Sequence, residues 1–155
     1  MIATTSSDAK AERLKSLGAH HVLNYRTTPD WGVQVKKLVP DGKGADIIVD
    51  VGGNSTLQQS LNAVRPDGVI AATGVLGDAP DGKAPSMLDC IWMGCTVRGI
   101  VLGTRKQFNE MNRFVEKHDI KPVLDKRIFE FDEVKEAYEF LVQQKHFSKI
   151  GIRIQ

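Results

Sequence analysis

The stretch ADIIVDV, residues 45–51, decides the fold class of this chain. Apart from Asp46 and Asp50 it is entirely apolar, and it is rich in β-branched side chains. A short, nearly continuous apolar run is typical of a parallel strand that helices cover on both faces. Asp50 at the carboxyl end of this strand is a candidate functional residue, although a capping or turn role is at least as well supported.

On either side of this strand, short β-prone runs alternate with amphipathic helical patterns. Thr28-Pro29 resembles an N-cap followed by proline at the first position of a helix, and Pro66-Asp67-Gly68 resembles a turn that leads into the next strand. Thr104 and Gln107 have the spacing of a capping box. Strands are expected at residues 1–5, 21–23, 69–73, 96–102, 128–131 and 149–154, and further helices at residues 8–17, 57–64, 86–93, 104 onward and 132–143.

This alternation predicts an α/β fold. We expect a three-layer, doubly wound, Rossmann-like parallel sheet with right-handed crossovers. No internal repeat, low-complexity stretch or long linker interrupts the chain, so residues 1–155 are expected to form one domain.

Composition excludes several classes of protein. The 155 residues are 41% hydrophobic and 26% charged, with a formal net charge of +2, which gives no basis for nucleic-acid binding. No apolar stretch reaches transmembrane length, so no membrane partner is expected. Cys90 and Cys95 are too few for a disulfide framework and are interpreted as reduced thiols of a cytoplasmic protein.

The common catalytic and nucleotide-binding motifs are absent. Neither Gly-x-Gly-x-x-Gly, a P-loop nor Gly-x-Ser-x-Gly occurs, and Gly42-Lys43-Gly44 precedes a strand instead of following one. The cysteines do not form a Cys-x-x-Cys pair and the four histidines are scattered, so no metal site is predicted.

One local pattern carries chemical information about a ligand. The first expected strand ends in Thr5-Ser6-Ser7, where a strand that contacts the ribose of NAD usually ends in an acid. Lys10 follows within one helical turn. Hydroxyl groups, a helix N-terminus and a lysine together suit a 2′-phosphate, so NADP is favoured over NAD. The alternative is that Ser7 only caps the helix and Lys10 is a solvated surface lysine.

Several segments, in order along the whole chain, resemble the C-terminal half of the medium-chain dehydrogenase/reductase superfamily. The nearest branch is that of the zinc-type alcohol dehydrogenases and quinone oxidoreductases. The segments that carry the resemblance are IATTSSDAKAERLKSLGAHHVLNYR (2–26), GADIIVDVGG (44–53), GVIAATGVLG (68–77), TVRGIVLGTRKQF (96–108) and FEFDEVKEAYEFLVQQKHFSKIGIRI (129–154).

The resemblance implies roles for matching positions. Thr5 occupies the place of the acid in NAD-using members. The expected cofactor contacts comprise the 2′-phosphate and adenosine pocket, glycines at a strand end, the loops that hold the nicotinamide, and a basic residue near the pyrophosphate. These residues are Ser6, Lys10, Tyr25, Gly52, Gly53, Gly74, Val75, Ile100, Val101 and Lys149.

The sequence departs from the family in lacking the catalytic domain, any zinc ligands, and the first strand with its Gly-rich turn. No catalytic residue is therefore assigned, and zinc is not expected to bind this segment. The first strand of the family lies between the second and the fourth, so its absence would leave unpaired edges. We expect either that these edges pair with a second copy of the chain or that the sheet collapses.

Three hypotheses for function follow. The chain is the cofactor-binding part of an NADP-dependent oxidoreductase that moves a hydride to or from carbonyl, alcohol or enone substrates, and by itself lacks full activity. Alternatively, it is a non-catalytic nucleotide-binding or interaction module that complements another chain. The third hypothesis is a remnant without a role.

Overall fold

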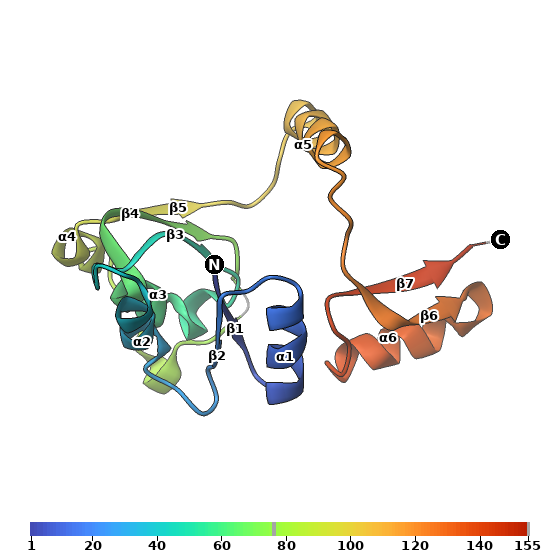
Figure 1. Ribbon diagram of the computed structural model, residues 1–155, viewed down its shortest axis with the longest axis horizontal. Helices are drawn as coiled ribbons and strands as arrows, with labels where there is room; N and C mark the ends of the chain where they lie inside the picture. Colours follow the sequence, from blue (N-terminus) through green and yellow to red (C-terminus); the bar gives the residue numbers. More distant parts are fainter. Residues whose placement is uncertain (76, 155) are drawn as a thin grey trace. The chain divides into compact units, whose positions relative to one another are not determined.

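The computed structural model describes residues 1–75 and 77–154. The chain divides into two compact units, Met1–Leu102 and Gly103–Gln155, which Figure 1 colours from blue to yellow and from yellow to red. The expectation of a single domain remains a prediction.

Unit 1 alternates strands and helices, as the sequence indicates. Its elements in chain order are β1 (Ile2–Thr5), α1 (Asp8–Ser16), β2 (His21–Asn24), α2 (Trp31–Leu38), β3 (Ala45–Asp50), the 3₁₀ turn η1 (Gly53–Ser55), α3 (Leu57–Ala63), β4 (Val64–Ala72), the 3₁₀ turn η2 (Pro80–Gly82), α4 (Asp89–Met93) and β5 (Thr96–Gly99).

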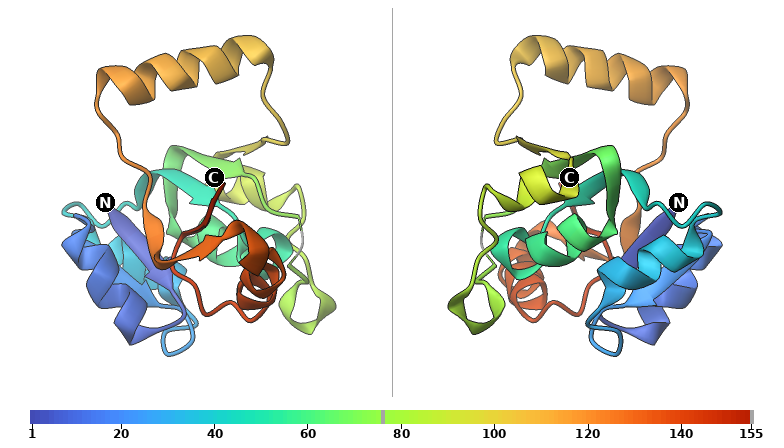
Figure 2. Two further views of the ribbon diagram at one scale, coloured as in Figure 1. Left: turned by 90° about the vertical axis from the view of Figure 1, so that its right-hand side faces the viewer. Right: turned by 90° about the vertical axis from the view of Figure 1, so that its left-hand side faces the viewer.

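Every strand pair in unit 1 is parallel, which confirms a mixed α/β fold of Rossmann type. The strands form two sheets, one of order β1-β2 and one of order β3-β4-β5. Within the described residues, no strand joins β1 to β3. The expected interruption of the sheet therefore lies between these two strands (Figure 2).

Helices α2 and α3 hold the two sheets together through one hydrophobic cluster. Trp31 and Val35 of α2 and Ala63 of α3 form its buried centre. Side chains from both sheets pack against it, namely Ile2, Leu23, Ala45 and Ile48. The spacing of Trp31 and Val35, one helical turn apart, places both on the inner face of α2.

The opposite face of β3 is apolar and exposed. Ile47, Val49 and Val51 are 71%, 67% and 73% exposed, whereas Ile48 packs against the core. Side chains alternate between the two faces of a strand, so Ile47 and Val49 share one face of β3, and Val51 follows directly after the strand. Within unit 1, helices α2 and α3 cover the face of β3 that carries Ile48, and no described helix of this unit covers the other face.

Two turn predictions are also wrong in detail. Helix α2 begins at Trp31 with Asp30 as its N-cap, because the peptide N–H of Thr28 closes a turn by donating to the Asn24 carbonyl at 2.9 Å. Pro66-Asp67-Gly68 lies inside β4. The strand accommodates it through a shift in register against β3, with Asp67 at a φ of 60°.

Unit 2 contains α5 (Arg105–Lys117), β6 (Leu124–Glu130), the 3₁₀ turn η3 (Phe131–Glu133), α6 (Val134–Val142) and β7 (Lys149–Arg153). The predicted capping box at Thr104 and Gln107 is confirmed. Strands β6 and β7 are parallel, and Phe129 and Ala137 are the buried hydrophobic residues of this unit.

Candidate functional site

The turn from β1 into α1 presents the predicted hydroxyl cluster. Thr5 is buried, and Ser6 and Ser7 are half-buried. Ser7 has extended backbone angles and caps α1, because its hydroxyl accepts a hydrogen bond of 3.3 Å from the peptide N–H of Lys10. The capping role weighed for Ser7 is confirmed. The side chains of Thr5 and Ser6 do not serve as the cap.

The end of β2 lies beside this turn. The peptide N–H of Tyr25 donates to the Thr5 carbonyl at 2.9 Å, which continues the pairing of β1 with β2. The structure therefore brings Ser6, Lys10 and Tyr25 to one end of this sheet, and the Tyr25 ring is partly exposed there.

An acidic group that the sequence analysis left unassigned lies at the same end. Asn24 donates a hydrogen bond of 2.8 Å from Nδ2 to Oδ1 of Asp8. This bond ties the first turn of α1 to the end of β2. The sequence signal for it was available, because Asp8 is the first residue of the expected helix and Asn24 follows the apolar part of the next strand.

At the end of β3, the buried carboxylate of Asp50 organises the turn into α3. Its oxygens accept hydrogen bonds from the Gly53 N–H at 2.9 Å, the Thr56 hydroxyl at 2.8 Å and the Ser60 hydroxyl at 2.6 Å. Asp50 is only 3% exposed. Of the two roles considered for it, the turn role is supported, because its oxygens are engaged with this chain's own donors.

Glycines allow the loops after β3 and β4 to approach each other. The peptide N–H groups of Thr73 and Gly74 donate to the Asp50 carbonyl at 2.8 and 3.3 Å. A Cβ atom on Gly74 would lie 1.9 Å from the Val51 carbonyl oxygen. A Cβ on Gly53, which has a φ of 63°, would lie 2.7 Å from the Gly74 oxygen. These glycines are therefore required by contact between the two loops.

The predicted nicotinamide loops follow β4 and β5. The Ile100 N–H donates to the Ala72 carbonyl at 2.9 Å, so Ile100 lies beside the end of β4. Val75 and Val101 are 85% and 89% exposed, and are thus accessible to a ligand at the carboxyl ends of these strands. Gly52, Gly53, Gly74, Val75, Ile100 and Val101 accordingly belong to one end of the second sheet.

Lys149 belongs to unit 2, unlike the other predicted cofactor residues. It begins β7, is exposed, and pairs across the sheet with Leu124. The structure places it only within that unit, so its role near a pyrophosphate remains a prediction.

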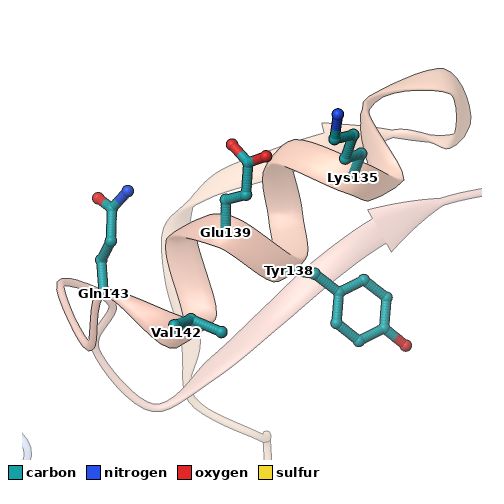
Figure 3. Close-up of a pocket in the computed structure, with 5 residues that line it drawn as sticks. All are labelled: Lys135, Tyr138, Glu139, Val142 and Gln143. Carbon is teal, nitrogen blue, oxygen red and sulfur yellow. The ribbon is translucent and has the colours of Figure 1, made fainter.

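A hollow on α6 is not a second site. Figure 3 shows that its lining side chains all project from one helix. They are Lys135, Tyr138, Glu139, Val142 and Gln143. A single helix face of mixed character lacks the convergent polar groups of a ligand pocket.

Residues 1–75 and 77–154 contain no cluster of three or more histidine, cysteine, aspartate or glutamate side chains that could hold a metal ion. In the same part of the chain, no helix has the length and apolar character needed to cross a membrane.

Comparisons with known proteins agree with this arrangement. Residues 1–117 match the profile of a family described as zinc-binding dehydrogenase. The chain is 38% identical over 155 residues to a zinc-type alcohol dehydrogenase-like protein of Schizosaccharomyces pombe, an alignment that covers 97% of this chain and 44% of that protein.

Solved structures show the same relationship. The crystal structure of an NAD-dependent alcohol dehydrogenase matches with a TM-score of 0.83 at 29% identity, over 99% of this chain and 43% of that chain. The 2-haloacrylate reductase structure matches with a TM-score of 0.74 at 28% identity, over 97% of this chain and 48% of that chain. The chain thus spans less than half the length of these relatives, and it belongs to the zinc-binding dehydrogenase family as the C-terminal, Rossmann-like half of a medium-chain dehydrogenase/reductase.

Proposed function

We propose that this chain is the cofactor-binding part of an NADP-dependent oxidoreductase of the alcohol dehydrogenase or quinone reductase type. The reaction would be hydride transfer to or from a carbonyl, alcohol or enone substrate. NADP supplies the hydride chemistry when it is bound, and the protein contributes binding and orientation. The isolated chain is not expected to have full activity, because no catalytic residue is assigned to it.

The single observation that carries the preference for NADP is the end of β1. Thr5 stands at the position where a strand that binds the ribose 2′-hydroxyl of NAD would end in an acidic residue. Ser6 and Lys10 lie at the N-terminus of α1. The N-terminus of a helix attracts anions through its peptide N–H groups and its dipole. An ammonium group within the first turn adds a positive charge that suits a phosphate.

The remaining predicted contacts suit the rest of a dinucleotide. The partly exposed Tyr25 ring could stack on an adenine, because it lies beside Thr5 at the same end of the sheet. The exposed Val75 and Val101 offer apolar and backbone contacts to a nicotinamide ring. Gly52, which is half-buried, leaves the backbone at the end of β3 without a side chain, whereas Gly53 is buried and would act by letting the loops after β3 and β4 pack closely.

Calorimetric titration of the purified chain with NADPH and, separately, NADH tests the proposal. NADPH should bind at least about tenfold more tightly, and Lys10→Ala should remove that preference while leaving NADH affinity unchanged. Lys15→Ala is the matched control, since Lys15 lies in the last turn of the same helix and pairs with Glu12. Equal affinities for the two nucleotides, or no binding of either, would contradict the proposal.

A second candidate function is a non-catalytic module that complements another chain or a second copy of itself. The apolar face of Ile47, Val49 and Val51 favours it, because these three apolar side chains, in or directly after β3, are exposed. The unpaired edges of β1 and β3 within the described residues could also accept a strand.

Sedimentation analysis of the chain separates these candidates. A module that pairs through this face should self-associate, or bind its complementing chain, and Val49→Glu should abolish the association because it buries a charge. Val33→Glu is the matched control, since Val33 is also an exposed valine but lies on α2. A monomer that binds NADPH would favour the first function.

A further inference from the structure

Helix α4 ends in a backbone motif that places two cysteines next to each other. Gly94 follows the helix with a φ of 58° and a ψ of 38°, in the left-handed region. Its N–H donates to the Ile91 carbonyl at 3.2 Å, and the Cys95 N–H donates to the Cys90 carbonyl at 3.2 Å. These two bonds together define a Schellman motif, in which Cys90 and Cys95 are the outer pair.

A contact between the side chains of its outer pair frequently accompanies a Schellman motif, and here both of these side chains carry thiols. Cys90 and Cys95 are half-buried, unoxidised, and packed against the same buried cluster of Leu61, Val64 and Ile70. Burial raises the pKa of the Cys95 thiol, and the neighbouring Cys90 thiol adds to this effect through charge and a hydrogen bond. The two sulfur atoms are therefore direct neighbours.

A further hydrogen bond fixes the loop that carries the pair. The N–H of Asp67, in the irregular part of β4, donates to the Gly94 carbonyl at 2.8 Å. The segment from Cys90 to Cys95 is thus held at both ends, by the end of α4 and by the start of β5. A pair fixed in this way loses little chain entropy when a bond forms between its members.

We propose that Cys90 and Cys95 form a thiol–disulfide exchange site whose substrate is a small disulfide such as oxidised glutathione. The product is an intramolecular disulfide that joins the end of α4 to the residue before β5. Nothing in the proposed dinucleotide-binding function requires this site.

The exchange proceeds in two balanced steps. Cys90 loses its proton, its thiolate attacks one sulfur of the small disulfide, and that S–S bond breaks to release one thiolate. Cys95 then loses its proton and attacks the Cys90 sulfur, which forms the internal S–S bond and releases the second thiolate. The two protons pass to the two thiolates that leave. The protein pair is oxidised by two electrons, and the small disulfide is reduced to two thiols.

Cys90 is assigned the first attack because the thiolate is the nucleophile and the surroundings of Cys95 disfavour its thiolate form. The second attack requires only that the two adjacent sulfurs align.

Chemical cleavage at methionine reads the product directly, because Met93 lies between the two cysteines. The chain is equilibrated at a series of ratios of oxidised to reduced glutathione, quenched with acid, and cleaved with cyanogen bromide without reductant. The peptides 88–93 and 94–111 remain joined only if Cys90 is bonded to Cys95, and the mass of the oxidised chain before cleavage shows whether this bond lies within one chain. The native chain should give the joined product at a ratio of oxidised to reduced glutathione at least about tenfold lower than the ratio that the same chain requires in concentrated urea.

Variants at Gly94 test whether the motif is the cause. A Cβ at this position meets nothing within 4 Å, so substitution affects only the backbone angles. Gly94→Ala should raise the ratio of oxidised to reduced glutathione needed for the disulfide toward the value measured in urea, because alanine disfavours a positive φ. Gly94→Asn should form the disulfide at the same ratio as the native chain, because asparagine tolerates this backbone conformation.

Three outcomes would overturn the proposal. They are a native chain that carries only mixed disulfides with glutathione, a product that joins two chains, and a Gly94→Ala variant that oxidises as readily as the native chain. The comparison of native and urea-treated chain remains decisive if Gly94→Ala does not fold.

Discussion

The Ser60 hydroxyl donates a hydrogen bond of 2.6 Å to Oδ2 of Asp50, and both side chains are buried. This bond connects the end of β3 to α3, the helix that shares the core with α2. The loop that carries Gly52 and Gly53 is therefore held in place by the Asp50 carboxylate, which accepts hydrogen bonds from three donors.

Ser60→Ala should lower the free energy of unfolding by about 1–3 kcal/mol, because it removes a hydrogen bond to a buried charge. Urea denaturation followed by circular dichroism measures this change. Ser55→Ala is the control and should change stability by less than about 0.5 kcal/mol, since the Ser55 hydroxyl donates to the Gly52 carbonyl at an exposed position. Equal effects of the two substitutions would show that the buried bond contributes no more to stability than the exposed one.

Gly74→Ala should destabilise unit 1 by about 1–3 kcal/mol or more, because the new Cβ would lie 1.9 Å from the Val51 carbonyl oxygen and backbone must move. Thermal unfolding measures the effect. At Gly99, at the end of β5, a Cβ meets nothing within 4 Å, so Gly99→Ala should be nearly neutral. If both variants melt alike, the two loops do not pack as closely as described.

Asp8→Asn should strengthen binding of NADPH by about threefold to tenfold and change NADH binding little. The substitution removes a negative charge beside the proposed phosphate position, while the amide oxygen can still accept the bond from Asn24. Calorimetry provides the affinities. Asp41→Asn, in the turn before β3, serves as a control for net charge alone. A uniform gain for both nucleotides would argue against a phosphate at this position.

The stability of unit 1 should decrease in alkaline solution through Cys95. Its pKa is raised in the folded chain, chiefly by burial, so folding favours the protonated thiol. This contribution is fully present below the pKa of an unfolded cysteine, about 8.5, and is lost as the pH rises through the higher folded pKa. Urea midpoints under reducing conditions at pH of about 7 and about 9.5 should differ more for the native chain than for Cys95→Ala. Parallel pH dependence of the two proteins would refute this assignment.

Much of the fold could be predicted because apolar periodicity and capping residues act locally. Residues 45–50 of the apolar run form β3, Ser7 caps α1, and Thr104 with Gln107 forms a capping box. The turn predicted from Pro and Gly residues was wrong where contacts distant in sequence determine the backbone conformation. Pro66-Asp67-Gly68 remains within a strand because Asp67 bonds to Gly94, which is distant in sequence.

The candidate site could be predicted only in part. Ser6, Lys10 and Tyr25 lie at one end of the sheet because parallel pairing of β1 with β2 brings two strand ends together. Asp50 was recognised as a candidate, but its three donors could not be identified, since they depend on how the turn through Gly53 folds back onto α3. The exposure of Val49 also escaped prediction, because an apolar sequence does not reveal which face of a strand lacks a cover.

The cluster of Trp31, Val35 and Ala63 determines whether the two sheets of unit 1 unfold together or separately. Within the described residues, no strand of one sheet is hydrogen-bonded to a strand of the other. The two sheets are therefore joined by the side chains that pack beneath α2 and α3. Strands β2 and β3 should then belong to one cooperative unit in native-state hydrogen exchange, with equal free energies of opening for their slowest amides. Truncating the Trp31 side chain would divide that unit in two, so that each sheet exchanges independently of the other.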